Sequence, residues 1–348
     1  MRYLPCSALL AALAAVSCAR VLDPPPPAGA LVPAPVGLAL GGVTPAEGPP
    51  RAAVSSVAAP STPLPQRSLD AGPARYPWLA GGDSAAEALA ERFAPPPGFV
   101  RVDLAPETFG AWLRDLPLAP PGTPVRSFRG AVILPGDHPN LAAVVALDVG
   151  DADLQQCADS VIRLHAEWLF ALGRRDASYR AASGAPMPFA RWARGERMVP
   201  QPAPGLGFTW SATGRPDAGH ASYRRWLDAV FTWANTGSLA REAEPVAGAD
   251  LRPGDFVVQP GAPGHAVLVL DLALAPGGRR ALLLGQGFMP AQSFHVLRPA
   301  GPGEPSGPRL RRREPPGAWF VVGPGALGLD TPFWAPFPWK TLHRFAGT

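Results

Sequence analysis

Three side chains that could do chemistry lie far apart along this sequence. Cys157 falls near the start of a predicted helix, His265 begins a predicted strand directly after Gly264, and Gln286 follows the next strand. Backbone N–H groups and the positive end of the dipole at a helix start stabilise a thiolate and could bind an oxyanion. A neutral histidine could act as general base for the thiol, with the glutamine amide orienting the imidazole. These residues therefore indicate covalent thiol chemistry.

Each of the three residues also has a purely structural interpretation. Buried cysteine commonly acts as a small hydrophobic residue, and Cys157 lies on an apolar stripe with Leu164 and Trp168 at helical spacing. His265 could be a core or edge histidine, and Gln286 could be a loop amide. The sequence leaves these alternatives open.

The elements that must position these residues follow a simple order. Apolar spacing of the helical period predicts helices over residues 84–93, 107–113, 154–172 and 223–235, with Asp153 as N-cap of the third helix and Gly237 ending the fourth. Apolar runs bounded by turn residues predict strands over residues 99–102, 131–134, 142–149, 254–258, 265–270 and 281–284, the second and third joined by a turn. Helices followed by an antiparallel meander predict an α+β fold with loop-rich insertions.

The N-terminus predicts export. One positive charge, a short apolar stretch and small residues precede Cys18, which matches a lipoprotein signal peptide over residues 1–18 with lipid on Cys18. An ordinary signal cleaved near Ala15 or Ser17 is the alternative. Proline-rich residues 19–76 predict a disordered tether, and residues 77–348 a single globular domain. We expect a lipid-anchored protein of the cell envelope, periplasmic or surface-facing, in the outer membrane if the host has one.

Charge and composition limit the classes of partner and cofactor that we expect. The net charge of +4 comes from scattered arginines with no basic stripe, so we expect no nucleic acid. Cys6 and Cys18 belong to the signal and its lipid site, which leaves Cys157 as the one unmodified thiol. The six histidines show no His-x-x-x-His spacing and the chain has no phosphate-binding loop, so we expect neither a metal nor a cofactor.

A polar, glycine-punctuated loop follows the last predicted strand and could form the lip of a binding site. It covers residues 285–292, and His295 comes shortly after it. Together with neighbours of the chemical residues, it supplies the predicted ligand contacts: Gln156, Asp255, Gly264, Met289, Gln292 and His295.

Several strings resemble the uncharacterised family called domain of unknown function 4846. They are residues 154–159 (LQQCAD), 163–168 (RLHAEW), 254–267, and 286–292 with His295, and the resemblance covers about residues 92–345. More distantly, a cysteine at a helix start, a Gly-His strand and a polar residue on the next strand resemble papain-like cell-wall amidases of the NlpC and CHAP types.

That second likeness implies a papain-like core, in which a helix bearing the cysteine packs on an antiparallel sheet. It assigns Cys157 as nucleophile, His265 as base and Gln286 as the residue that orients the base. The chain departs from the pattern in the long separation of Cys157 from His265 and in having Gln where many members have His, Asn or Glu.

The sequence thus predicts a lipid-anchored envelope protein that acts as a thiol hydrolase of the amidase or peptidase type, on peptidoglycan or a peptide. The alternative is a non-catalytic envelope protein that binds a glycan, a peptide or a protein partner through a groove lined by tryptophans. The candidates for that groove are Trp192, Trp210, Trp226, Trp233, Trp334 and Trp339.

Overall fold

The computed structural model describes residues 75–81, 87–202, 207–299 and 317–348. The predicted signal peptide, the lipid site at Cys18 and all but the last two residues of the predicted tether lie outside these ranges. Residues Ser68–Thr348 form one compact unit. Tyr76, which the sequence places at the end of the tether, is only 3% exposed and packs on Trp78 and Trp112. This aromatic ring is therefore part of the core.

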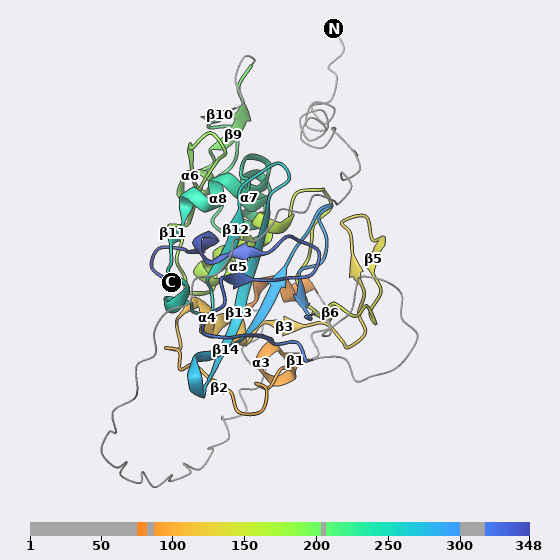
Figure 1. The fold of residues 1–348 in the computed structure, drawn as a ribbon. Coiled ribbons are helices and arrows are strands. Elements are labelled where there is room, and N and C mark those ends of the chain that lie inside the picture. The colour runs from red at the N-terminus through yellow and green to blue at the C-terminus, as the bar shows by residue number, and fades with distance from the viewer. Residues whose placement is uncertain (1–74, 82–86, 203–206, 300–316) are drawn as a thin grey trace, which may run out of the picture. The chain divides into compact units, whose positions relative to one another are not determined.

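A nine-stranded antiparallel sheet is the centre of the described structure (Figure 1). Its strand order is β11–β19–β12–β13–β14–β15–β6, with β2 beside β13 and β16 beside β14. The strands are β2 Val100–Arg101, β6 Leu141–Val144, β11 Glu244–Pro245, β12 Phe256–Gln259, β13 His265–Ala275, β14 Arg279–Gln286, β15 His295–Leu297, β16 Phe320–Val322 and β19 Leu342–Arg344. This sheet, together with the helices, agrees with the predicted α+β class.

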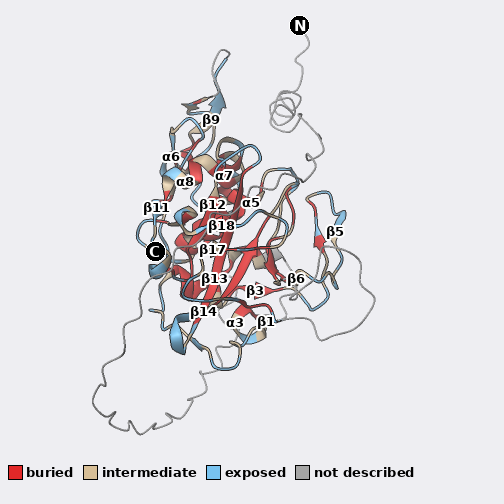
Figure 2. Cartoon of the chain, viewed as in Figure 1, coloured by how far each residue is buried: buried red, intermediate tan, exposed pale blue. Residues whose placement is uncertain are grey.

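The strand β13 shows why the middle of the sheet is buried on both faces (Figure 2). Its sequence is a nearly continuous apolar run, as is typical of a strand covered on both sides. Ala266 and Leu268 pack in the larger hydrophobic cluster, which contains the long helix after Gln156. Val267 and Val269 pack on the other face, in a cluster with residues of the C-terminal segment. The sheet is thus a layer between helices and C-terminal chain.

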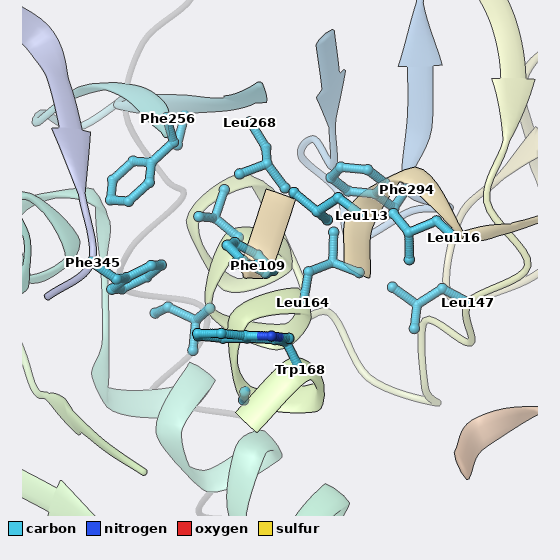
Figure 3. Packing of buried hydrophobic residues seen from close by; sticks show 14 of the residues in the cluster. Phe109, Leu113, Leu116, Leu147, Leu164, Trp168, Phe256, Leu268, Phe294 and Phe345 are labelled. Atoms are coloured by element: carbon cyan, nitrogen blue, oxygen red, sulfur yellow. The ribbon is translucent and has the colours of Figure 1, made fainter. Parts of the chain in front are cut away.

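The helices of the described ranges cover mainly one face of the sheet. They are α3 Leu89–Arg92, α4 Phe109–Arg114, α5 Cys157–Ala171, α6 Phe189–Ala193, α7 His220–Trp233 and α8 Thr236–Glu242, with 3-10 turns at Pro77–Gly81, Gly248–Asp250, Pro276–Gly278 and Trp339–Thr341. Figure 3 shows Leu164 and Trp168 of α5 together with Phe109 of α4 and with Phe256 and Leu268 of the sheet. None of these helices has the length and apolar character that a bilayer span requires.

The start of α5 differs from the prediction. The helix begins at Cys157 with Gln156 as N-cap, and the backbone N–H of Gln156 donates to the Asp159 carboxylate at 3.1 Å. Asp153 is therefore not the cap. Its carboxylate accepts from the backbone N–H of Ala291 at 2.6 Å and from the Gln156 side chain at 3.0 Å. The tertiary contact with Ala291 takes the side chain that local sequence would assign to the helix.

Short two-stranded ladders flank the main sheet. They are β1 Glu87–Ala88 with β3 Pro117–Leu118, β4 Val125–Arg126 with β5 Val132–Leu134, β7 Ser178–Arg180 with β8 Pro186–Pro188, β9 Arg197–Pro200 with β10 Phe208–Ser211, and β17 Gly328–Leu329 with β18 Phe337–Pro338. The predicted pairing of residues 131–134 with 142–149 is wrong, because β5 pairs with β4 whereas β6 pairs with β15. Val132 and Ile133 are exposed and belong to an outer ribbon, while Leu141 is buried in the main sheet.

The end of α7 is set by the start of the next helix, α8. Gly237 does not end this helix, because α7 stops at Trp233 and Gly237 lies in α8. Asn235 caps α8 by accepting the Ser238 backbone N–H at 2.8 Å. The apolar pattern predicted one helix that continues to Asn235, but Asn235 is instead the N-cap of a second helix.

Candidate functional site

Cys157 is the first residue of α5 and lies against the start of β13. Its side chain is buried, and Sγ is 3.8 Å from the carbonyl oxygen of Gly264, to which the thiol donates a weak hydrogen bond. Burial raises the pKa of the thiol to about 11, with a further contribution from the Asp159 carboxylate, and the N–H groups of Ala158 and Ala266 oppose it. Loss of solvent thus outweighs the backbone N–H groups, which by themselves favour the thiolate at this helix start.

His265 is the first residue of β13 and is completely buried. Its Nε2 lies 2.8 Å from Oε1 of Gln286, whereas its Nδ1 has no hydrogen-bond partner among the described residues. Burial lowers the pKa of the imidazole to about 4, and the bond to Gln286 opposes that effect. The ring packs against both Phe288 and Trp334, each with its centroid 4.8 Å from that of His265. At neutral pH this histidine is an uncharged base in an aromatic setting.

Gln286 is the last residue of β14 and is also buried, at 1% exposure. The chain next to it touches the start of α5, since a Cβ on Gly287 would lie 2.2 Å from Oγ of Ser160 and 2.9 Å from the carbonyl oxygen of Gln156. The absence of a side chain at Gly287 therefore lets the end of β14 approach the helix that carries Cys157.

The structure thus brings the three predicted chemical residues to one region, although Cys157 and His265 are not hydrogen-bonded to each other in the described structure. His265 and Gln286 are hydrogen-bonded, and Cys157 contacts the carbonyl of Gly264, the residue before His265. No hydrogen bond joins the Cys157 thiol to the His265 imidazole in the described structure. The resting arrangement is a neutral thiol at the Gly264 carbonyl and a neutral imidazole on Gln286.

Gly264 is positioned by close packing. A Cβ there would lie 2.3 Å from Oγ1 of Thr236 and 2.8 Å from the carbonyl oxygen of Gln259, so only glycine fits without movement. This close approach of α8 and β12 fixes the carbonyl that receives the Cys157 thiol. Thr236 gave no signal in the sequence, because its importance comes from a contact with a residue distant in the chain.

The other predicted ligand contacts are spread over different environments. Gln156 is partly buried, and Met289 is partly buried in the loop after β14. Gln292 is buried in a bridge with Ser127, and its Oε1 has no hydrogen-bond partner in the described ranges. His295 is fully buried on β15, with its Nδ1 3.0 Å from the Ser293 carbonyl oxygen, so it does not face solvent.

Asp255 lies away from His265. It precedes β12, whose far end, at Gln259, pairs with His265. Its carboxylate binds the Arg344 guanidinium at 2.6 and 2.9 Å and accepts the Arg252 backbone N–H at 2.7 Å. The structure therefore gives Asp255 an anchoring contact with β19 and not a place beside the imidazole.

Two groups beside the candidate site received no role from sequence reasoning. Asp159 is buried within the first turn of α5, and burial raises the pKa of its carboxyl to about 8. The sequence names Trp334 only as a groove candidate, yet its indole N–H donates to Gln259 at 2.9 Å and its ring packs on His265. Phe333, next to it, has a φ of 73°, an uncommon conformation for a residue with a side chain.

The described residues include a cavity of about 300 Å³ at the opposite end of α5. Trp112, Trp168 and Leu172 line it, and none of the predicted site residues does. No group of three or more His, Cys, Asp or Glu side chains within the described ranges is arranged to hold a metal ion.

Fold and site together define an α+β protein with a buried thiol, imidazole and amide where a helix start meets the ends of two central strands. The chain belongs to the family described as domain of unknown function (4846), whose model matches residues 89–344. No curated protein and no solved structure matches the chain.

Proposed function

We propose that this protein is a thiol hydrolase of amide or peptide bonds with a papain-like core. In this proposal Cys157 is the nucleophile, His265 the general base, and Gln286 the residue that orients the imidazole. The observation that carries it is the state of His265: Nε2 is held by an amide oxygen at 2.8 Å, while the buried Nδ1 has no partner in the described structure. A histidine with one nitrogen fixed and the other free is suited to accept a proton from a neighbouring thiol.

The reaction would begin with transfer of the Cys157 S–H proton to Nδ1 of His265 as Sγ bonds to the carbonyl carbon of the substrate. The backbone N–H groups at the start of α5 would stabilise the oxyanion of the tetrahedral intermediate. That intermediate collapses as the C–N bond breaks, and the amine leaves with the proton from the imidazolium. Water then attacks the thioester by the same route, which releases the acid and restores the thiol.

The resting protein does not hold the nucleophile in ionised form. The raised thiol pKa of about 11 and the lowered imidazole pKa of about 4 both disfavour a standing thiolate–imidazolium pair. Proton transfer must therefore accompany substrate binding, which would displace the thiol from the Gly264 carbonyl and bring it to Nδ1. Apo geometries of catalytic pairs are often loose in this way.

We further propose that the protein is exported and anchored by lipid on Cys18, in the outer membrane if the host has one. The support is the N-terminal pattern of charge, short apolar stretch and small residues before that cysteine. A long proline-rich tether would let the domain reach peptidoglycan or a peptide at some distance from the bilayer.

One observation favours a non-catalytic alternative. The Cys157 thiol is buried and already hydrogen-bonded to a backbone carbonyl, as expected for a structural cysteine. In that case the chain would bind a glycan, a peptide or a protein partner in the envelope without cleaving it, and Phe333, which is 41% exposed and precedes Trp334 in the chain, offers an aromatic contact.

Cleavage of purified peptidoglycan sacculi and of a mixed peptide library separates the two proposals. We expect the full chain to release new amino termini, Cys157→Ala to release none, and His265→Asn to be slower by about 10²- to 10⁴-fold. His343→Asn, on β19, which β12 separates from the strand of His265, is the matched control and should match wild type. Cleavage that survives in Cys157→Ala would refute the nucleophile, and co-sedimentation with sacculi without cleavage would favour the binding protein.

A further inference from the structure

A row of three buried polar side chains crosses three neighbouring strands of the sheet. His265 on β13, Gln286 on β14 and His295 on β15 are between 0 and 1% exposed. Nε2 of His265 lies 2.8 Å from Oε1 of Gln286, and Nε2 of Gln286 lies 3.4 Å from Nε2 of His295. Nδ1 of His295 lies 3.0 Å from the carbonyl oxygen of Ser293. The row therefore begins at a backbone carbonyl and ends at the free Nδ1 of His265.

The backbone carbonyl fixes the direction of every hydrogen bond in this row. The Ser293 oxygen can only accept, so Nδ1 of His295 carries the proton. A neutral imidazole has one N–H, so Nε2 of His295 must accept, and it accepts from the amide NH₂ of Gln286. The amide oxygen is thereby turned toward His265, whose Nε2 must donate to it. Nδ1 of His265 is left with a lone pair.

The opposite set of hydrogen-bond directions fails at both ends of the row. A flipped Gln286 amide would place its oxygen against Nε2 of His295, where two acceptors would face one another. The same flip would require Nε2 of His265 to accept, which moves the proton to the buried, unpartnered Nδ1. A charged His295 could donate from both nitrogens, but burial, with smaller contributions from His265 and His138, lowers its pKa to about 4 despite the opposing bond to Ser293. At neutral pH one arrangement satisfies the row.

We infer that His295 is a positioning residue that acts through Gln286 to hold His265 in the tautomer with Nε2 protonated and Nδ1 free to accept a proton. The inference about the tautomer depends only on the buried row. Its use in catalysis rests on the proposed function, since Nδ1 is the atom that would take the Cys157 proton. His295 thus has a role in the site although it is too buried for the predicted ligand contact.

Nitrogen NMR of the histidine rings tests this directly, because protonated and unprotonated ring nitrogens resonate apart. In the full wild-type chain we expect the unprotonated nitrogen of His265 to be Nδ1, with assignment from the signal lost in His265→Asn. In His295→Leu the amide can flip, and the tautomer ratio should shift by roughly fivefold, the change that one hydrogen bond produces. His295→Gln, which keeps an acceptor near Nε2, should restore the wild-type ratio.

His165, buried on α5 with Nδ1 2.8 Å from the Tyr179 hydroxyl, is the internal control and should keep its signals in every variant. A wild-type His265 with the proton on Nδ1 would overturn the inference, and this measurement needs no variant to fold. An unchanged ratio in folded His295→Leu would overturn it as well. Because tautomers are read without substrate, the inference can stand if no cleavage is found, and it can fail while cleavage is observed.

Discussion

The thiol of Cys157 should be a poor nucleophile in the resting protein. Burial beside the Asp159 carboxylate gives it a pKa of about 11, so the thiolate fraction at pH 7 is about 10⁻⁴. An unperturbed cysteine with a pKa of about 8.5 has roughly 3% thiolate at the same pH. Since alkylation proceeds through the thiolate, iodoacetamide should modify Cys157 about 300-fold more slowly than a model thiol.

The assay is a time course of alkylation of the full folded chain, read by mass spectrometry on the peptide that contains Cys157. This readout separates it from Cys6 and Cys18. The rate should rise tenfold for each pH unit up to about pH 11, because the thiol pKa is raised and only the thiolate reacts. Steric shielding lowers the rate at every pH without moving the midpoint, so the pH profile isolates the electrostatic effect. The same peptide in denatured chain should react like a model thiol.

A rate at pH 7 that equals or exceeds that of the model thiol, with a plateau from weakly acidic pH, would refute this reasoning. It would mean that a thiolate–imidazolium pair exists before substrate binds, and that burial does not control the thiol. His265→Asn would then identify the partner, because its loss would return the rate to the slow profile.

Three further predictions concern stability. Asp159→Asn should flatten the pH dependence of the free energy of unfolding. The raised carboxyl pKa of about 8 makes the wild type most stable below about pH 4 and about 4 kcal/mol less stable at pH 7. Urea unfolding at pH 4 and pH 7 measures this difference, and an equal difference in variant and wild type would contradict the prediction. Gly264→Ala should destabilise by about 1–3 kcal/mol because its Cβ would lie 2.3 Å from a neighbouring hydroxyl oxygen, whereas Gly323→Ala, with nothing within 4 Å, should leave the thermal midpoint unchanged. Arg163→Met should cost about 3–5 kcal/mol in chemical unfolding because it takes the arginine from the buried Glu167 carboxylate, and the exposed Arg174→Met should cost less than about 0.5 kcal/mol; similar losses would argue against the buried pair.

Local sequence was enough to predict where the chemical side chains fall on elements. The apolar run after Pro263 and Gly264 predicts the strand that begins at His265, and the apolar stripe after Cys157 predicts a helix. Both signals arise within a few residues, through turn chemistry and hydrophobic period. The mixed fold class follows from the order of such elements.

Strand pairing and helix caps were harder, because distant residues compete for the same groups. Asp153 has the type and spacing of an N-cap, but Ala291 takes its carboxylate and the helix begins at Cys157. The strand at Leu141–Val144 pairs with His295–Leu297, far along the chain, and not with its sequence neighbour. The hydrophobic periodicity of neither segment indicates which strand it pairs with.

The sequence by itself determined that one cysteine falls in the first turn of a helix and that one histidine opens a strand, since hydrophobic period and turn residues are local signals. The tertiary structure decided the chemical state of both. It buried the thiol and raised its pKa, where the helix start alone favours a thiolate. It also set Gln286 and His295 behind His265, whose Nδ1 has no hydrogen-bond partner among the residues that the structure describes. The Cys157 thiol is buried by residues more than a hundred positions away, and the hydrogen-bonded row that includes His265 crosses three strands. Only the folded chain could therefore assign the chemical state of either residue.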